Sequence, residues 1–345
     1  MLTSNTIKTF CKAQGADLVG ISSMDRFDGA PKQMDLRYIF PGAKSLIVMA
    51  FRIARGSFRG IEEGTHFATY PSLGYAAINQ IYQPMVLWKL IQFIEDEGYE
   101  AVAIPNLNGG EAINPVNGNF RRNWSIKTAE DKPYPDVLVH FRIAAFCAGL
   151  GEIGWSKIFL TPEFGPRQRF VLLMTDAELE PDPLYEGKIC DRCKLCVKNC
   201  AGHAISKDES VKVTIAGRVV EWGKFNPMAC EKGLQGGTDK KLNPFIEEYP
   251  RRYGYGRAIE GAAGCMRACM VHLEQRKVLK NKFHNPFRTS EPWKIDRKIN
   301  YELTDEIIRH YEKNQQIEDA MEYMNYSQKD NFGTAKKEKI NPLID

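Results

Sequence analysis

Apolar residues in the first half of the chain follow two spacings, one typical of helices and one typical of buried strands. Thr6–Gln14 and Ala76–Asp96 place apolar residues three and four positions apart, which predicts helices. The unbroken apolar run Ala43–Phe51 predicts a strand buried on both faces, at the centre of a sheet. Shorter runs predict a helix at Arg142–Ala148 and strands at Ala16–Ile21, Glu100–Ile104, Lys157–Leu160 and Arg169–Thr175.

This alternation predicts an α/β domain over residues 1–182, which ends at Pro181-Asp182-Pro183. Residues 183–288 contain seven of the nine cysteines and are expected to form a second domain of short helices and loops. Residues 289–345 are charged and helix-prone, and we expect a helical tail there. The aromatic residues Tyr82, Trp88 and Phe93 lie on the predicted helix and are interpreted as packing residues.

Composition narrows the class of protein without naming a partner. Of the 345 residues, 43% are hydrophobic, which excludes global disorder, and a net charge of +4 indicates neither a nucleic-acid nor a membrane surface. No run approaches the roughly 20 apolar residues of a membrane span, and the N-terminus has no export motif. We therefore expect a soluble, cytoplasmic protein, in which cysteines stay reduced and bind metals rather than form disulfides.

Four cysteines have the C-x2-C-x2-C-x3-C spacing of bacterial ferredoxins, which bind [4Fe–4S] clusters. In two-cluster ferredoxins the fourth cysteine of this run binds the other cluster. That rule predicts a first cluster on Cys190, Cys193, Cys196 and Cys269, and a second on Cys200, Cys230 and Cys265.

The second cluster is one cysteine short, because Ala262 stands where a full motif would have the eighth. It is either [3Fe–4S], or [4Fe–4S] with a non-cysteine ligand or an open position at the fourth site. A structural zinc site is the alternative, since C-x2-C pairs also bind zinc. His203 follows the run and is a further candidate ligand, although a histidine there also suits a surface position.

Three stretches before the cysteines carry a family resemblance: Ala148–Trp155, Leu160–Arg167 and Thr175–Asp182. Together with the cysteine run they resemble the cobalamin-dependent epoxyqueuosine reductase and reductive dehalogenase superfamily, over roughly residues 1–288. The resemblance implies an α+β fold, with a nitroreductase-like corrinoid-binding α/β domain followed by a ferredoxin-like domain with two iron–sulfur clusters. The chain departs from the family pattern at Ala201, where a proline is usual, and it lacks a recognisable helical-repeat domain. A nucleic-acid substrate is therefore not expected.

The resemblance implies an oxidoreductase that performs a reductive cleavage, by dehalogenation or deoxygenation, on a small molecule through the Co(I) state of a base-off cobalamin. The clusters would pass electrons from an external low-potential donor, such as a ferredoxin or flavodoxin, to the cobalt. The alternative is an electron-transfer or corrinoid-handling protein that turns over no substrate of its own.

The reductive step consumes a proton, so we expect an acidic group in the pocket. The candidates are Asp136, His140, Tyr134 and Tyr75. Each has a structural alternative: Asp136 follows a proline and suits a helix cap, and a single histidine or tyrosine often belongs to the core.

Contacts to the corrinoid are implied for glycines that allow close approach, and for an aromatic residue and two arginines near them. These residues are Gly149, Leu150, Gly151, Gly154, Trp155, Arg167 and Arg169. The alternatives are an ordinary glycine turn, a core tryptophan and arginines paired with carboxylates.

Overall fold

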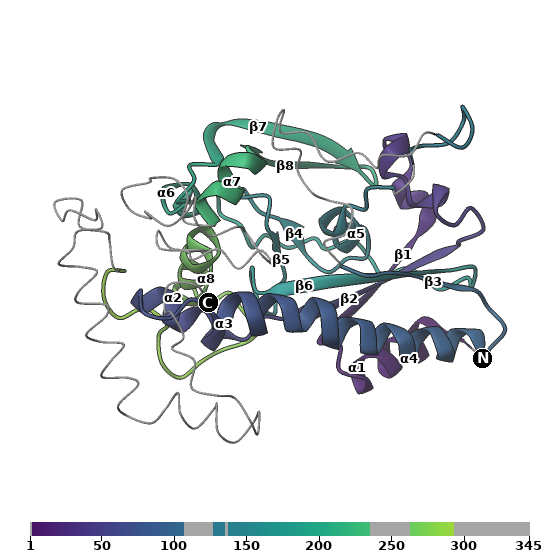
Figure 1. Cartoon of the computed structure of the whole chain (residues 1–345), viewed down its shortest axis with the longest axis horizontal. Helices are drawn as coiled ribbons and strands as arrows, with labels where there is room; N and C mark the ends of the chain where they lie inside the picture. The colour runs from purple at the N-terminus through teal and green to yellow at the C-terminus, as the bar shows by residue number, and fades with distance from the viewer. Residues whose placement is uncertain (1, 107–126, 135–136, 235–262, 293–345) are drawn as a thin grey trace, which may run out of the picture.

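The computed structural model describes residues 2–106, 127–134, 137–234 and 263–292, and every structural statement below applies to these residues (Figure 1). None of their helices combines the length and the apolar content that crossing a membrane requires. The first part of the chain contains α1 (Ser4–Ala13), β1 (Leu18–Ser23), β2 (Ser45–Arg52), α2 (Arg59–Glu63), α3 (Thr69–Pro71), α4 (Gln83–Glu95), β3 (Ala101–Ile104), α5 (Phe141–Cys147), β4 (Glu152–Ile153), β5 (Phe159–Leu160) and β6 (Gln168–Thr175). The cysteine-rich part contains α6 (Leu195–Lys198), β7 (Ile205–Ile215), β8 (Arg218–Phe225), α7 (Pro227–Leu234) and α8 (Gly264–Gln275).

Short 3-10 turns η1 (Met24–Phe27), η2 (Lys32–Met34) and η3 (Leu36–Tyr38) follow β1, and η4 (Arg55–Phe58) follows β2. Two π-helical turns, η5 (Ser72–Ala76) and η6 (Ile78–Tyr82), lead into α4. The helix expected over Ala76–Asp96 is thus present, but its first part is wound as π-helix. Such π-helical turns are rare overall, and those that occur often lie at functional sites.

A four-stranded antiparallel sheet in the order β1-β2-β6-β3 forms the centre of the first part. The β2 and β6 strands are interior, with Phe51 opposite Arg169 in their register. The prediction of a central strand at Ala43–Phe51 is confirmed, since the first seven residues of β2 are all buried. The apolar pattern gave no strand direction, which is antiparallel throughout.

The sheet is covered on both faces, and alternate residues of its strands belong to different cores (Figure 1). Helices α1 and α4 cover one face, where the rings of Phe10 and Phe93 stack at 4.3 Å. Helix α5 covers the other face, together with residues of the β7–β8 hairpin. The molecule is a mixed helix-and-strand protein, as the fold class predicted at this coarser level.

The expectation that the three aromatic residues of this helical segment are packing residues was wrong in part. Phe93 is a packing residue, but Tyr82 and Trp88 are 53% and 61% exposed on the outer face of η6 and α4. A broad apolar face predicted burial of the whole stripe, whereas the sheet covers only one side of a helix.

The expectation of short helices and loops in residues 183–288 omitted one extended element. Strands β7 and β8 form a long antiparallel hairpin in this region. Its turn is Ala216-Gly217, and both residues have positive φ angles, 48° and 74°. Two-residue turns of this kind match the twist of paired strands. The sequence contained this sign, with alternating apolar residues on either side of the glycine turn.

Candidate functional site

The seven cysteines of the second part come from a loop and three helices that converge on one region. The run begins as a loop at Cys190, continues through α6 and ends at Cys200. Helix α8 packs against α6 and contributes Cys265 and Cys269, while α7 contributes Cys230. All seven are free thiols, and Cys196 and Cys200 are buried.

Cys190, Cys193, Cys196 and Cys269, which we call the first thiol group, are electrostatic neighbours. Burial raises the pKa of the Cys269 thiol well above its usual value, and the charges of the other three members raise it further. Burial likewise raises the pKa of Cys196 to about 11, again with Cys190 and Cys193 adding to the effect. The structure therefore brings Cys269 close to the cysteine run.

Cys200, Cys230 and Cys265 form the second thiol group. Burial raises the pKa of Cys265 to about 12, and the charges of Cys230 and Cys200 contribute next. Asn226 attaches α7 to this group, because its backbone N–H donates to Ala204 O at 2.8 Å while its side chain caps the helix. The first turn of α8 lies against the end of the run, where Gly264 approaches the carbonyl oxygen of Asn199.

The backbone of the run suits an anionic cluster. Arg192 and Lys194 both have left-handed φ angles of 62°, which is uncommon outside glycine. Alternation of right- and left-handed residues turns successive N–H groups toward one side, an arrangement found around phosphates and iron–sulfur clusters. The thiol groups and this loop therefore fit the clusters that the sequence predicts.

A second metal arrangement is present at the edge of the first thiol group. Ligand atoms of Asp191, Cys193 and His272 lie within 4.8 Å of one another. The His272 Nε2 is 2.7 Å from Asp191 Oδ2, and Arg276 lies 3.4 Å from the same carboxylate. Cys193 belongs both to the first thiol group and to this group with Asp191 and His272. Analysis of the bound metal would therefore distinguish an iron–sulfur cluster from the zinc alternative. His203 is exposed, and its backbone N–H donates to Cys200 O in a turn.

The glycine-rich loop of the family resemblance joins the first part of the chain to the cysteine run. Glu152 Oε1 accepts hydrogen bonds from the backbone N–H groups of Ile189 and Cys190, at 2.8 and 2.5 Å. Trp155 is buried against Cys196 and Cys200, and its indole N–H donates to Ser206 O at 2.9 Å. Both side chains thus position the cysteine-rich part.

The glycines of this loop are required by contacts within the chain. A Cβ on Gly149 would lie 2.2 Å from Pro183 O, and one on Gly151 would lie 2.0 Å from Leu160 O. Gly154 packs against the Leu160 side chain, and the Leu150 side chain packs into the core on the α5 face. These contacts give the loop a structural role that does not depend on a ligand.

The two arginines expected near a cofactor differ in their surroundings. Arg167 is 1% exposed, and its guanidinium donates to Ile53 O at 2.8 Å and to Asn281 Oδ1 at 2.7 Å. Arg169 is half-buried, and its guanidinium lies 3.8 Å from the centre of the Tyr75 ring. Its Nε also donates to Asn79 Oδ1 at 3.1 Å.

Tyr75 and Asn79 come from the two π-helical turns, so this unusual winding directs both toward Arg169. Tyr70 lies beside them. Burial raises its pKa, the charge of Arg169 lowers it, and the charges of Cys265, Tyr75 and Cys230 raise it. The Tyr70 hydroxyl is also 3.6 Å from Met266 Sδ. A tyrosine-arginine site therefore adjoins the second thiol group.

Sequence reasoning missed Tyr70 and Asn79. Asn79 is a polar residue in an apolar helical stretch, which was a visible sign. Nothing in the sequence connected it to Arg169, which lies on a strand far along the chain.

His140 and Tyr134 lie elsewhere. His140 caps α5, where its Nδ1 accepts from the Ile143 N–H at 3.3 Å. The backbone of Tyr134 exchanges two hydrogen bonds, each of 3.0 Å, with the Gln33 side chain. Asp136 is outside the described residues. Of the described candidates, His140 and Tyr134 therefore lie apart from Tyr75.

His140 lines a cavity of about 490 Å³ on the α5 face of the sheet, between the η1–η3 segment and the β7–β8 hairpin. Its walls are mostly apolar: Phe27, Pro31, Met34, Leu36, Val139, Ile143, Val213, Ile215 and Trp222. Lys157 also lines it, with its ammonium 5.4 Å from the centre of the Trp222 ring. Burial and the neighbouring charge of Arg142 lower the Lys157 pKa.

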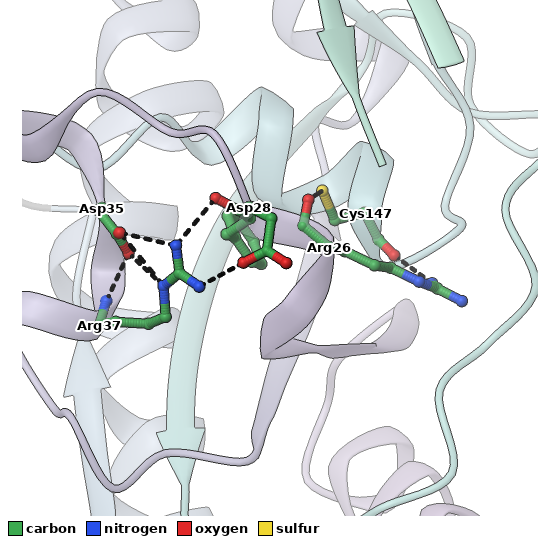
Figure 2. A network of polar contacts seen from close by, with 6 residues as sticks. Arg26, Asp28, Asp35, Arg37 and Cys147 are labelled. Carbon is green, nitrogen blue, oxygen red and sulfur yellow. Dashed lines mark hydrogen bonds and ion pairs between the residues drawn. The ribbon is translucent and has the colours of Figure 1, made fainter. Parts of the chain in front are cut away.

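Two further charged residues on the cavity wall are already paired (Figure 2). Arg26 donates to the carbonyl oxygens of Cys147 and Asp182, at 2.5 and 2.7 Å. Asp28 accepts from Arg37, which also binds Asp35. Within the described part of the chain, no carboxylate lies within ion-pair distance of Lys157. Among the described residues, Lys157 is therefore a cation on the cavity wall with no carboxylate partner, while the Arg26 guanidinium is bound by carbonyl oxygens.

Comparison with known proteins gives partial matches. The tetrachloroethene reductive dehalogenase of Dehalobacter restrictus (strain DSM 9455 / PER-K23) is 44% identical over 130 residues, which cover 35% of this chain and 20% of that protein. The corresponding enzyme of Sulfurospirillum multivorans is 38% identical over 63 residues, 17% of this chain and 13% of that protein. Parts of the chain are thus similar in sequence to the reductive dehalogenases. The resemblance inferred from the sequence is thereby confirmed, and the matched segments span a fifth or less of these relatives.

No protein-family model matches the chain. Among solved structures, the catabolic reductive dehalogenase NpRdhA is 19% identical with a TM-score of 0.47, over 80% of this chain and 37% of that one. Epoxyqueuosine reductase from Streptococcus thermophilus is 16% identical with a TM-score of 0.49, over 89% and 74%. Reductive dehalogenases and epoxyqueuosine reductases are both oxidoreductases.

Replacement of Gly264 by alanine should remove iron from the second thiol group. The added methyl would lie 2.3 Å from Asn199 O, so α8 must move away from the end of the run. We expect about three or four fewer irons per chain after anaerobic reconstitution, with secondary structure retained. Gly56→Ala is the control, because open space surrounds Gly56. Normal iron content in the Gly264→Ala protein would contradict this account of the site.

The His140 imidazole should make stability depend on pH. Burial, with the charges of Arg142 and Lys157, lowers its pKa from 6.5 to about 3. Between these values only the unfolded state binds the proton, so stability falls as pH falls, by at most about 1.4 kcal/mol per pH unit. Urea unfolding at pH 7, 6 and 5 should show a shallower decline for His140→Asn. His66→Asn, at an exposed histidine, should match the native protein.

Proposed function

We propose that the chain is a cobalamin-dependent iron–sulfur reductase that cleaves a bond in a halogenated small molecule. The observation that carries the proposal is the position of Tyr70, which contacts Met266 beside Cys265 and is influenced by the charges of Arg169 and of the second thiol group. The related tetrachloroethene reductive dehalogenases support the choice of a halogenated substrate. Deoxygenation is the alternative cleavage, since the resemblance also includes epoxyqueuosine reductases.

Electrons would enter at the first cluster and leave from the second. The first cluster would lie near the surface, because its ligand Cys193 is exposed. Helix α8 supports this path because it carries Cys265 and Cys269 on one face, a single turn apart. The next groups beyond the second cluster are Met266 and Tyr70, which touch each other, and then Tyr75. An external low-potential protein, such as a ferredoxin or flavodoxin, would supply the electrons.

Tyr75 is the proton donor in this proposal. Its hydroxyl is a weak acid on a half-buried ring, and Arg169 holds a cation against that ring. Arg169 is itself held by the buried Asn79 carbonyl oxygen, which fixes the pair before substrate binds. A positioned acid of this kind contributes about 10²–10⁴-fold to a rate.

When bound, cobalamin would supply the strongly nucleophilic and reducing Co(I) centre. The loop residues expected to contact it, Gly149–Trp155, are occupied by contacts within the chain, as is Arg167. The cavity beside Lys157 suits one part of cobalamin, its nucleotide tail. In a base-off corrinoid this tail is extended and carries one phosphate, which a lysine ammonium can bind. We therefore assign the tail to Lys157, with Trp222 and Ile143 as apolar walls.

The proposed reductase is tested with anaerobically reconstituted protein, reduced methyl viologen and tetrachloroethene, by measuring released chloride. Tyr75→Phe should lower kcat by about 10²-fold or more without changing the content of about seven or eight irons. Tyr82→Phe is the matched control, because Tyr82 is exposed on the next turn. Chloride release by Tyr75→Phe at the native rate would remove the proton-donor role. Iron and cobalt without turnover of any halogenated or oxygenated substrate would favour the electron-transfer or corrinoid-handling alternative, and zinc would exclude both.

The tail assignment is tested by binding two corrinoids, cobalamin and cobinamide, which lacks the nucleotide tail. The native protein should bind cobalamin more tightly, and Lys157→Met should weaken cobalamin by about 10-fold or more while leaving cobinamide unchanged. Lys44→Met removes an exposed cation and should change neither. Equal weakening of both corrinoids would contradict the assignment.

A further inference from the structure

Glu62 holds a buried ion-pair network that the proposed electron path does not use directly. The Glu62 side chain is 5% exposed, and its Oε2 accepts from Arg267 Nη1 at 2.5 Å and from Arg288 Nη2 at 3.0 Å. Its Oε1 accepts from Arg288 Nε. We call these three residues the Glu62 network. Burial alone would raise the Glu62 pKa, but the hydrogen bonds from Arg288 and Arg267 hold it below its usual value.

Arg267 lies between ligands of both proposed clusters. It is two residues after Cys265 and two before Cys269 on α8. The two cysteines are four residues apart and share one face of the helix, so Arg267 projects from the opposite side. Glu62, on α2, therefore binds the side of α8 that is opposite to the two cysteines. Any movement of α8 away from α2 would displace a ligand of each cluster.

The network also places net charge close to the clusters. One carboxylate and two guanidinium groups leave a charge of +1 in a buried setting, where charges are poorly screened. Arg267 is 6% exposed, and its Nε has no hydrogen-bond partner among the described atoms. The charge of Arg267 and that of Cys265 act on each other. A nearby cation favours the more negative, reduced form of a cluster.

We propose that the Glu62 network is a positioning device that fixes α8 and raises the reduction potential of the second cluster. The inference depends on the proposed function, since it requires clusters on the thiol groups. Arg267 and Arg288 act through the clusters and touch no substrate. The network thereby adjusts the reduction potential of the second cluster, the last electron carrier before the Tyr75–Arg169 site. It lies on the side of α8 opposite to the face that carries Cys265 and Cys269.

The test is an anaerobic potentiometric titration followed by electron paramagnetic resonance, on protein with both clusters. Glu62→Gln raises the network charge to +2 and should shift the second cluster to a more positive potential. Arg288→Gln lowers the charge to zero and should shift it to a more negative one. The double variant has the native charge and should return close to the native potential. Opposite signs cannot arise from simple loosening of α8, which would move both variants alike.

Two further variants complete the design. Glu63→Gln, at the exposed neighbouring residue on α2, should leave the potential unchanged. Arg267→Lys keeps the charge and should keep the potential even if some iron is lost. Shifts of the same sign in Glu62→Gln and Arg288→Gln, or no shift in either, would overturn the inference. Native protein that binds no iron would instead overturn the proposed function, so the two failures are distinct.

Discussion

Contact between α8 and the cysteine run is the constraint on which the rest of the structure depends. Each thiol group takes members from both segments, because the fourth cysteine of the run, Cys200, belongs to the second group while Cys269 of α8 belongs to the first. Chain segments that are distant in sequence meet only if other contacts offset the entropy of ordering them. Here those contacts are the close approach of Gly264 to Asn199, the hydrogen bond from Arg276 to Ile189 O at 2.9 Å, and the Glu62 network.

The central sheet divides the site into two regions with different chemistry. Arg169 has the same parity along β6 as Val171 and Leu173, which face α1 and α4. Phe170 and Leu172 face α5, the side of the cavity that Lys157 and His140 line. Proton donation and tail binding are therefore assigned to opposite faces of one rigid element. A defect in one region need not disturb the other, so the Tyr75 and Lys157 variants report on separate parts of the proposal.

The spacing of apolar residues predicted the elements well, because a strand that is buried on both faces needs a nearly continuous apolar run, such as that in Ser45–Arg52. It did not predict strand direction, which depends on connections rather than on any one strand. The β7–β8 hairpin was visible in the sequence and was overlooked among the cysteines. The spacing predicts the cysteine pairing, which stays a prediction, and the structure brings all seven thiols into one region. The contact between Tyr75 and Arg169 was not predictable, because it depends on the sheet register and on the π-helical turns together.

The pair Arg167 and Arg169 shows why residue type alone does not assign a role. They are two residues apart, carry the same charge and belong to the same sequence motif. Arg167 precedes the strand and is buried, and its guanidinium stabilises the backbone at Ile53 and the segment at Asn281. Arg169 lies in β6 and is half-buried, and among the described residues its side chain donates to Asn79 Oδ1 and its guanidinium lies over the Tyr75 ring. Two donors of the buried Arg167 are bound to the chain, whereas the Arg169 guanidinium rests on the ring of Tyr75. The chemistry of the motif is therefore assigned to Arg169, and its structural part to Arg167.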